Sequence, residues 1–223
     1  YNNSKYIIKM SNPAGTNWGN TAAGTTFTNL NYAYYASLSG GSDDQPTDGN
    51  LETSWDLFAN ADEVDISLLL AGNASTTVGT YIIQSIAETR KDCVAFVSPK
   101  LTDVVQQAGN ETTNINTTRN AYPSSSYAVM DSGWKYTFDK YNNIYRWIPL
   151  NGDIAGLCVN TDTVRDPWWS PAGFNRGQIK NAVKLAWNPN KTARDTIYPI
   201  GVNPVVAFPG EGTVLYGDKT LQT

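Results

Sequence analysis

The residues that enzymes most often use for acid–base chemistry and metal binding are scarce in this sequence. It contains no His and two cysteines, Cys93 and Cys158, each within a separate apolar run. Lack of His excludes His-based triads and His-ligated metal sites, and two isolated cysteines cannot build a Cys-rich zinc site. No phosphate-binding Gly-rich motif is present. The sequence therefore predicts no catalytic, cofactor-binding or metal-binding residues, and we expect both cysteines to be buried free thiols.

Acidic residues supply the remaining candidates for chemistry. Residues 44–49 resemble the start of a calcium-binding loop, but the pattern fails at two of its later ligand positions. Asp62, Glu63 and Asp65 precede a predicted strand, where the paired carboxylates of a hydrolase could lie. Nothing in the sequence marks a cleft near either group. We therefore interpret the first as a solvated loop and the second as a solvated entry into a strand.

Two adjacent tryptophans, Trp168 and Trp169, could form a platform for a sugar ring. They lie in a connector rich in Pro and Gly, so packing in the core or at an interface is the favoured interpretation. Two alternatives stay open at this point. A carbohydrate-binding surface module predicts an exposed tryptophan on a concave face, and a hydrolase predicts a deep cleft with carboxylates roughly 5–10 Å apart.

Composition indicates which partners the chain suits. The 223 residues carry a net charge of -4, only 16% are charged, and 12% are aromatic. Without a run of Lys or Arg, this composition predicts no nucleic-acid partner, whereas a surface rich in Trp, Tyr, Asn and Thr suits contact with protein. No apolar stretch is long enough to span a membrane, so we expect no membrane partner. Because the chain begins at Tyr1 rather than Met, we expect a piece of a longer protein.

The strongest structural pattern lies in the middle of the chain. Residues 64–71 and 93–97 are apolar runs with β-branched residues, and residues 76–91 place apolar side chains at helical spacing between them. Strand, helix and strand in so short a segment form a βαβ unit, which predicts that the two strands are parallel. A short helix capped by Thr53 is expected before this unit, through residue 60.

The remaining elements follow from turn residues and alternation. A third strand is expected over residues 126–130, and residues 134–138 and 144–148 should form a hairpin. Polar residues 109–126 are interpreted as a loop. Further expectations are a helix capped by Asn151 that runs to residue 162, a strand over 183–187, a short helix over 190–197, and paired strands over 205–208 and 212–216.

The N-terminal part reads differently. Residues 5–10 and 31–38 are expected to be strands, and residues 40–50 form a loop by their Gly, Asp and Pro content. We therefore expect residues 1–50 to be the end of a β-rich, surface-exposed domain plus a linker loop, and residues 51–223 to be one α/β domain. The predicted fold class is α+β or α/β, a mixed sheet flanked by helices.

Four blocks of sequence, in order, resemble contractile phage tail sheath proteins. They are the Gly-Gly-x-Asp loop at residues 38–43, a helix-to-strand step at 87–99, a Pro-x-x-Gly-x-x-Ala-Gly helix start continuing through 149–173, and a long signature at 201–221. The order and spacing of the blocks make the resemblance specific. Glu211 departs from the basic residue usual in the Pro-Gly-x-Gly turn, which leaves any contact made by a basic side chain there in doubt.

The resemblance implies a structural, non-enzymatic subunit of a contractile tail sheath. Such subunits polymerise in six-membered rings around a tail tube, and contraction drives the tube through the host envelope during genome ejection. The implied partners are other copies of the subunit, the tail tube, the baseplate and the tail terminator, with no cofactor. The implied location is the virion tail, after assembly in the host cytoplasm. Because the chain ends at Thr223, we expect the C-terminal tube-binding domain to be absent and the isolated fragment to be a monomer.

Overall fold

A parallel β-sheet forms where the sequence has its short, continuous apolar runs. The computed structural model describes residues 45–223, and residues 46–223 form one compact unit. Strands β1 (Leu68–Leu70), β2 (Val94–Val97), β3 (Ala128–Asp131) and β7 (Val202–Asn203) lie in the order β1-β2-β3-β7, and every neighbouring pair is parallel. The predicted βαβ unit is confirmed, since β1 and β2 are hydrogen-bonded neighbours with parallel register.

A single helical run connects β1 to β2 and covers one face of the sheet. It comprises α2 (Thr76–Tyr81), the π-helical turn η3 (Ile82–Ala87) and α3 (Glu88–Arg90). The Ser75 hydroxyl caps the run by accepting a hydrogen bond from the Val78 N–H at 3.2 Å, one residue before the predicted start. Fully buried isoleucines of η3 pack into the core beneath the helix.

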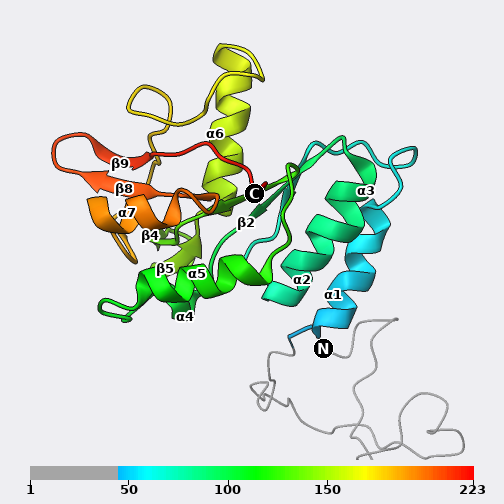
Figure 1. Ribbon diagram of the computed structural model, residues 1–223, viewed down its shortest axis with the longest axis horizontal. Coiled ribbons are helices and arrows are strands. Elements are labelled where there is room, and N and C mark those ends of the chain that lie inside the picture. The colour runs from blue at the N-terminus through cyan, green and yellow to red at the C-terminus, as the bar shows by residue number, and fades with distance from the viewer. Residues whose placement is uncertain (1–44) are drawn as a thin grey trace, which may run out of the picture. The chain divides into compact units, whose positions relative to one another are not determined.

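The N-terminal helix α1 (Asp48–Trp55) lies outside this run and continues into the 3-10 turn η2 (Asp56–Phe58). Figure 1 shows α1 alongside α2 and α3, on the side of them away from the sheet. The predicted cap at Thr53 was wrong: Thr47 caps α1, and the Thr53 hydroxyl donates inside the helix to the Gly49 carbonyl. Thr47 was overlooked as a cap because Pro46 before it and Asp48, Gly49 and Asn50 after it are residues typical of a loop.

Helices α4 (Leu101–Val104) and α5 (Glu111–Ala121) complete the cover of this face. The prediction of a loop over residues 109–126 was wrong, because α5 occupies most of it. Its sequence is rich in Thr and Asn, which favour helices weakly, and only Ile115 is a large apolar residue on the buried side. Thr118 and Arg119, three and four positions on, are buried beside it and complete the inward stripe.

Arg119 explains how so polar a helix is held in place. Its guanidinium donates to three backbone carbonyls, those of Ile200 at 2.7 Å, Tyr122 at 3.1 Å and Leu221 at 2.7 Å. These contacts fasten α5 to the segment after α7 and to the C-terminal residues of the chain. A charged side chain thus does the anchoring that an apolar residue would do in a more typical helix.

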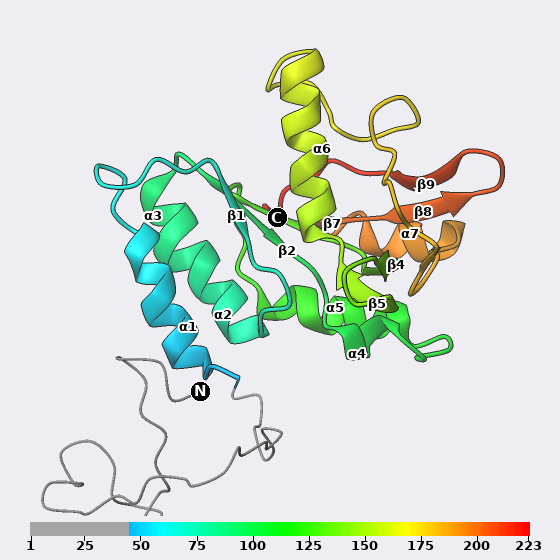
Figure 2. The ribbon, with the colours of Figure 1, turned by 180° about the vertical axis from the view of Figure 1, so that it is seen from behind.

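The opposite face of the parallel sheet is covered by α6 (Asn151–Val164), which stands alone there (Figure 1, Figure 2). Side chains from alternate strand positions separate into two cores. Ala95 and Val97 join the core under α2 to α5, while Phe96 between them joins the core under α6. The predicted cap at Asn151 was wrong by one residue: Leu150 holds the cap position and Asn151 is the first helical residue, with its side-chain amide donating to the Gly72 carbonyl at 2.8 Å. The helix runs two residues beyond the expected end.

The antiparallel strands form sheets of their own. The predicted hairpin is confirmed as β4 (Trp134–Asp139) and β5 (Ile144–Pro149), and the short β6 (Lys184–Leu185) extends it in the order β5-β4-β6. Strands β8 (Val205–Phe208) and β9 (Gly212–Leu215) pair as predicted, next to helix α7 (Lys191–Ile197) capped by Asn190. The α/β fold class is confirmed, with parallel and antiparallel pairing segregated into different sheets.

Some expectations concern residues outside the described part of the chain. The strands over 5–10 and 31–38, the loop from residue 40 to 44 and the first aspartate of the calcium-like segment all lie there. In the described part, α1 crosses residue 50, where a domain boundary was expected. Among residues 45–223 there is no helix with the length and hydropathy needed to cross a membrane.

Candidate functional site: a closed sheet edge and two open surfaces

The carboxylates singled out in the sequence lie on an exposed turn. Asp62, Glu63 and Asp65 are all exposed and precede β1 without entering a cavity. Asp48, from the calcium-like segment, is the first residue of α1, where its carboxylate accepts a hydrogen bond from the Ser75 hydroxyl at 2.8 Å. Within residues 45–223, no three His, Cys, Asp or Glu side chains are grouped so that they could hold a metal ion.

The carboxyl ends of parallel strands are where α/β proteins usually bind ligands, and here that edge is filled by the chain itself. Asp131, at the end of β3, is completely enclosed; it accepts hydrogen bonds from the Ser98 hydroxyl at 2.6 Å and the Gly133 N–H at 2.8 Å. Ser98 in turn accepts from the Asn151 N–H at 3.1 Å. Burial raises the pKa of Asp131 to about 7, against the opposing effect of these hydrogen bonds.

A second polar pair continues this edge. The Lys135 ammonium, almost fully buried, lies 2.8 Å from the Asp153 carboxylate of α6 and donates to the Lys180 carbonyl at 2.9 Å. Every partner of these groups comes from the chain, so they hold β2, β3, β4 and α6 together. The arrangement can stabilise a rigid junction, and it presents no open position to a substrate.

The tryptophans of the connector after α6 are exposed. Trp168 keeps 80% of its surface accessible, which rules out packing in the core and leaves the predicted packing at an interface as a prediction. Trp169 is half-exposed and lies beneath the guanidinium groups of Arg165 and Arg176, 6.0 and 5.3 Å from the ring centre. The Trp169 ring therefore makes cation–π contacts with two arginines of the protein itself.

A contiguous aromatic surface covers one face of the β5-β4-β6 sheet. Register places Tyr136 opposite Trp147 and opposite Lys184, and Phe138 opposite Tyr145. The Tyr136 ring centre lies 4.8 Å from that of Trp147 and 5.5 Å from that of Tyr145. We call the four aromatic residues Tyr136, Phe138, Tyr145 and Trp147 the aromatic face. Cross-strand aromatic pairs stabilise a hairpin, yet Phe138 and Tyr145 still expose 46% and 52% of their surface.

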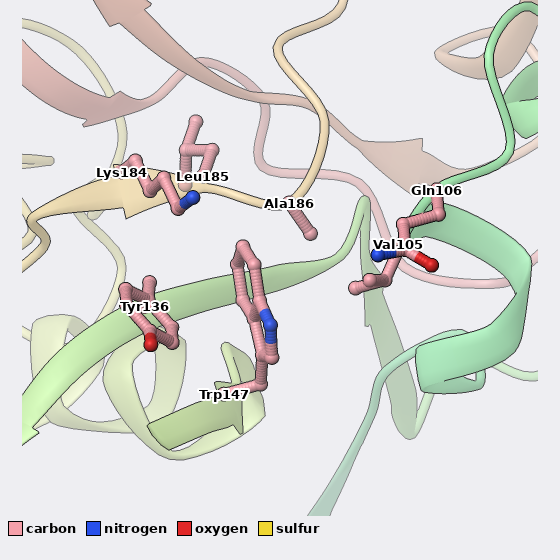
Figure 3. A pocket seen from close by; sticks show the side chains of 7 residues that line it. All are labelled: Val105, Gln106, Tyr136, Trp147, Lys184, Leu185 and Ala186. Atoms are coloured by element: carbon pink, nitrogen blue, oxygen red, sulfur yellow. The ribbon is translucent and has the colours of Figure 1, made fainter. Parts of the chain in front are cut away.

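One end of the aromatic face borders a shallow hollow of about 310 Å³ (Figure 3). The indole of Trp147 stands in its middle, between β6 and the turn that follows α4. The Lys184 ammonium lies 5.1 Å from the Tyr136 ring centre and 5.5 Å from that of Trp147, so the cation is held over the rings. The hollow therefore offers apolar surface beside a fixed positive charge.

A larger hollow, of about 550 Å³, lies beside α6 where that single helix leaves the sheet partly uncovered. Leu68, Val94 and Val129 on the sheet and Cys158 on α6 are half-buried along it. Both cysteines are free thiols, as predicted, but only Cys93 is fully buried. Burial raises the pKa of both thiols and keeps them protonated and unreactive.

Charge is distributed unevenly over the described residues. No Lys or Arg occurs between residues 45 and 89, and Arg90, which donates to carbonyls of this segment, is almost fully buried. The segment from α1 to the start of β1 carries six acidic residues that we call the acidic flank: Asp48, Glu52, Asp56, Asp62, Glu63 and Asp65. None of the six takes part in an ion pair among residues 45–223. Lys140 and Lys184, by contrast, are exposed on the β5-β4-β6 sheet.

The aromatic face was missed in the sequence although a signal for it exists. Trp134, Tyr136 and Phe138 occupy every second position of β4, and Tyr145 and Trp147 do so in β5. Alternation of this kind places all five rings on one side of the hairpin. The sequence could not tell how far that side faced the core. Trp134 is buried there, with its indole N–H donating to the Pro99 carbonyl at 2.7 Å, and Trp147 packs against the same core while half-buried.

Comparison with known proteins gives this architecture a family. The family model described as "Phage tail sheath protein central domain" matches residues 54–221. The tail sheath protein of Vibrio phage KVP40 is 45% identical over 202 residues, and that of Enterobacteria phage T4 is 42% identical over 202 residues. These alignments cover 81% and 82% of this chain but 30% of each relative, so the chain spans under a third of their length.

Solved structures with the same fold come from contractile assemblies. The helical sheath of the anti-feeding prophage in the contracted state superposes with a TM-score of 0.58, covering 82% of this chain and 46% of that chain at 19% identity. The sheath complex of an extracellular contractile injection system, PVC, in the contracted state gives a TM-score of 0.55, covering 72% of this chain and 41% of that chain at 20% identity. At such identity the likeness concerns the fold.

Proposed function

This chain belongs to the phage tail sheath protein family, and from that premise we propose that it is part of the structural subunit of a contractile tail sheath. The complete subunit would polymerise in six-membered rings around the tail tube, and contraction would drive the tube through the host envelope during genome ejection. The observation that carries the proposal is the family match, which extends over residues 54–221 and so includes nearly every described element.

The interior of the domain supports a mechanical role. Asp131, Ser98 and Asn151 are buried where an α/β enzyme would open its site, and they bond to one another. A body joined in this way moves as a unit, which suits a sheath that exchanges one set of subunit contacts for another of lower free energy. The proposed subunit has no enzymatic activity and uses no cofactor, because the energy is stored at assembly.

The remaining parts of the proposal follow from the same role. The partners would be copies of the subunit along with the tail tube, the baseplate and the tail terminator; the location would be the virion tail after assembly in the host cytoplasm. We assign residues 51–223 to the sheath α/β domain and residues 1–50 to the end of an outer domain with its linker. The isolated chain would be a monomer, since it aligns with only 30% of the length of each relative and would lack the other parts of the subunit that take part in assembly.

Electron microscopy tests the proposal directly. The complete reading frame that contains this sequence, expressed alone, should yield striated hollow cylinders. Intact phage tails carrying it should shorten when heated or treated with mild denaturant in the absence of nucleotide. A strict requirement for ATP in contraction would contradict the proposal. So would a complete subunit that forms no cylinders at any concentration and is absent from the sheath of intact tails.

A further inference from the structure

The aromatic face is an unpartnered sheet surface in the part of the chain that the structure describes. Phe138 and Tyr145 are half-exposed, and Tyr141 at the tip of the hairpin exposes 87% of its surface. Tyr and Trp are enriched in protein–protein interfaces because they supply large contact area at small cost in conformational entropy. An aromatic surface of this extent on a soluble domain typically marks a contact site.

The backbone beside this surface is also unpartnered. Strand β5 is an edge strand, and within residues 45–223 the Ile144–Ile148 segment has backbone hydrogen bonds only to β4. Exposed edge strands invite pairing with another chain unless charge, proline or a covering element prevents it. Arg146 supplies one charge, and it is paired with Asp139 at 2.8 Å.

The charge beside the aromatic face is positive. Lys184 lies over the rings of Tyr136 and Trp147, and Lys140 lies over the Tyr141 ring at 5.1 Å. Neither ammonium forms an ion pair among the described residues, since the four pairs there involve other side chains. A partner for this surface should therefore carry apolar groups surrounded by carboxylates.

The chain itself carries such a surface on its other side. In both Figure 1 and Figure 2, α1 lies on one side of the parallel sheet and β4 and β5 lie toward the other. Leu57 exposes 73% of its surface and Phe58 is also exposed, and both lie among the carboxylates of the acidic flank. The two surfaces are complementary in charge and both have an apolar centre.

We infer that the aromatic face of one subunit receives the acidic flank of a second copy. Leu57 and Phe58 would pack against the rings, while Asp62 and Glu63 approach Lys184 and Lys140. Because the two surfaces differ and lie on different sides of the body, the contact is head-to-tail and generates rings or helices rather than a closed two-fold dimer. The inference rests on the proposed sheath function and names the faces that meet within the assembly.

Charge reversal on each surface distinguishes a second copy of the subunit from any other binding partner. In the complete reading frame, Lys140→Glu with Lys184→Glu makes the aromatic face acidic, and Asp62→Lys with Glu63→Lys makes the flank basic. Each double variant alone brings like charges together, so its critical concentration for assembly should rise about tenfold or more. Mixed in equal amounts, the two variants should assemble again, because each altered surface then meets an altered complement.

Matched measurements separate this inference from the sheath function itself. Asp162→Lys, near the C-terminal end of α6, reverses one exposed acidic residue that belongs to neither surface and should assemble like the wild type. All variants should keep the wild-type unfolding temperature, because every altered side chain is solvent-exposed and the core is unchanged. If wild-type protein forms cylinders and either variant does so equally well alone, the inference fails while the sheath function stands. Failure of the mixture to assemble would overturn it too, and an absence of cylinders from wild-type protein would overturn both.

Discussion

The parallel sheet and the β5-β4-β6 sheet use the same kinds of side chain for opposite purposes. In β2, successive residues Ala95, Phe96 and Val97 enter two different cores, and all three are buried. In the hairpin, Phe138 and Tyr145 pair across the strands and stay half-exposed to solvent. Burial on both faces fixes a shape, whereas an exposed, internally paired face keeps apolar area available for another molecule.

The same contrast holds for charged groups. Arg119 and Asp131 are buried, and each is satisfied by partners within the domain, so their removal should disturb the fold. Lys184, Asp62 and Glu63 are exposed, so their removal should disturb association and leave the fold intact. The predictions below test how far this separation between the interior and the surfaces holds.

The largest effect is expected at Arg119. Arg119→Ala would leave the carbonyls of Ile200, Tyr122 and Leu221 buried without a donor, which should lower the free energy of unfolding by about 5 kcal/mol. Urea unfolding of the 223-residue chain measures this. Arg146→Ala is the matched control, since Arg146 is half-exposed in its pair with Asp139 and should cost below about 1 kcal/mol. Equal losses in the two variants would contradict the contrast.

The next effect is a pH dependence due to Asp131. Its pKa is raised to about 7 in the folded protein, chiefly by burial, while the unfolded chain has the ordinary value. Between about pH 4 and 7 the folded state therefore binds more protons than the unfolded state, so stability falls as pH rises through that range. The loss should be at most about 4 kcal/mol.

Asp131→Asn tests this origin, because an amide does not titrate. Unfolding followed at several pH values between 4 and 8 should show a flatter profile for the variant than for the wild type. The amide resembles the neutral carboxyl group that Asp131 carries in the folded protein well below pH 7, so the stability of the variant at low pH should lie close to that of the wild type. An unchanged slope would assign the pH dependence to other groups.

The sequence predicted the elements whose pattern is local and missed those that depend on distant partners. The βαβ unit, the hairpin and the existence of helix α6 follow from apolar periodicity and turn residues, and all are confirmed, although the cap of α6 lies one residue earlier than predicted. Helix α5 was taken for a loop because its inward stripe depends on Arg119, whose three acceptors include Ile200 and Leu221. No local pattern shows that a charged residue will find buried carbonyls so far along the chain.

The surfaces were predicted least well, for a physical reason. Alternation in β4 and β5 identifies one aromatic side, but exposure depends on whether another element covers it, and no covering element occurs among residues 45–223. For Trp168 the sequence left core and interface packing open, and the structure rules out only the core. The absence of catalytic and metal-binding residues remains a prediction from composition, to be tested by assays of the complete protein.

A glycine in the C-terminal signature gives an intermediate effect. Gly201 has a φ of 89°, and an added Cβ would lie 2.8 Å from the Thr220 carbonyl oxygen. Gly201→Ala should therefore cost about 2–3 kcal/mol from backbone strain together with crowding. Gly210→Ala is the control, because Gly210 has a similar φ of 84° with open space around it. The difference between their unfolding free energies isolates the crowding, and equal losses would assign the whole effect to φ.

The smallest effect on folding is expected at Tyr145, and it tests the surface half of the comparison. Its ring lies 5.1 Å from that of Phe138 and 5.5 Å from that of Tyr136, so Tyr145→Ala removes two aromatic contacts from a half-exposed site. Such pairs contribute little where solvent is near, and the free energy of unfolding should fall by below about 1 kcal/mol. Ile83→Ala, which empties part of the fully buried core, should cost about 2–5 kcal/mol in the same assay.

Assembly should reverse this order. Tyr145→Ala removes an aromatic contact from the inferred interface, so the complete protein should polymerise less readily although its fold is nearly as stable as the wild type. Ile83→Ala should weaken assembly only to the extent that it unfolds the subunit. Buffer conditions that restore the stability of the subunit should therefore restore its assembly. If Tyr145→Ala destabilised the domain as much as Ile83→Ala, the hairpin would belong to the rigid interior rather than to a surface held ready for another copy.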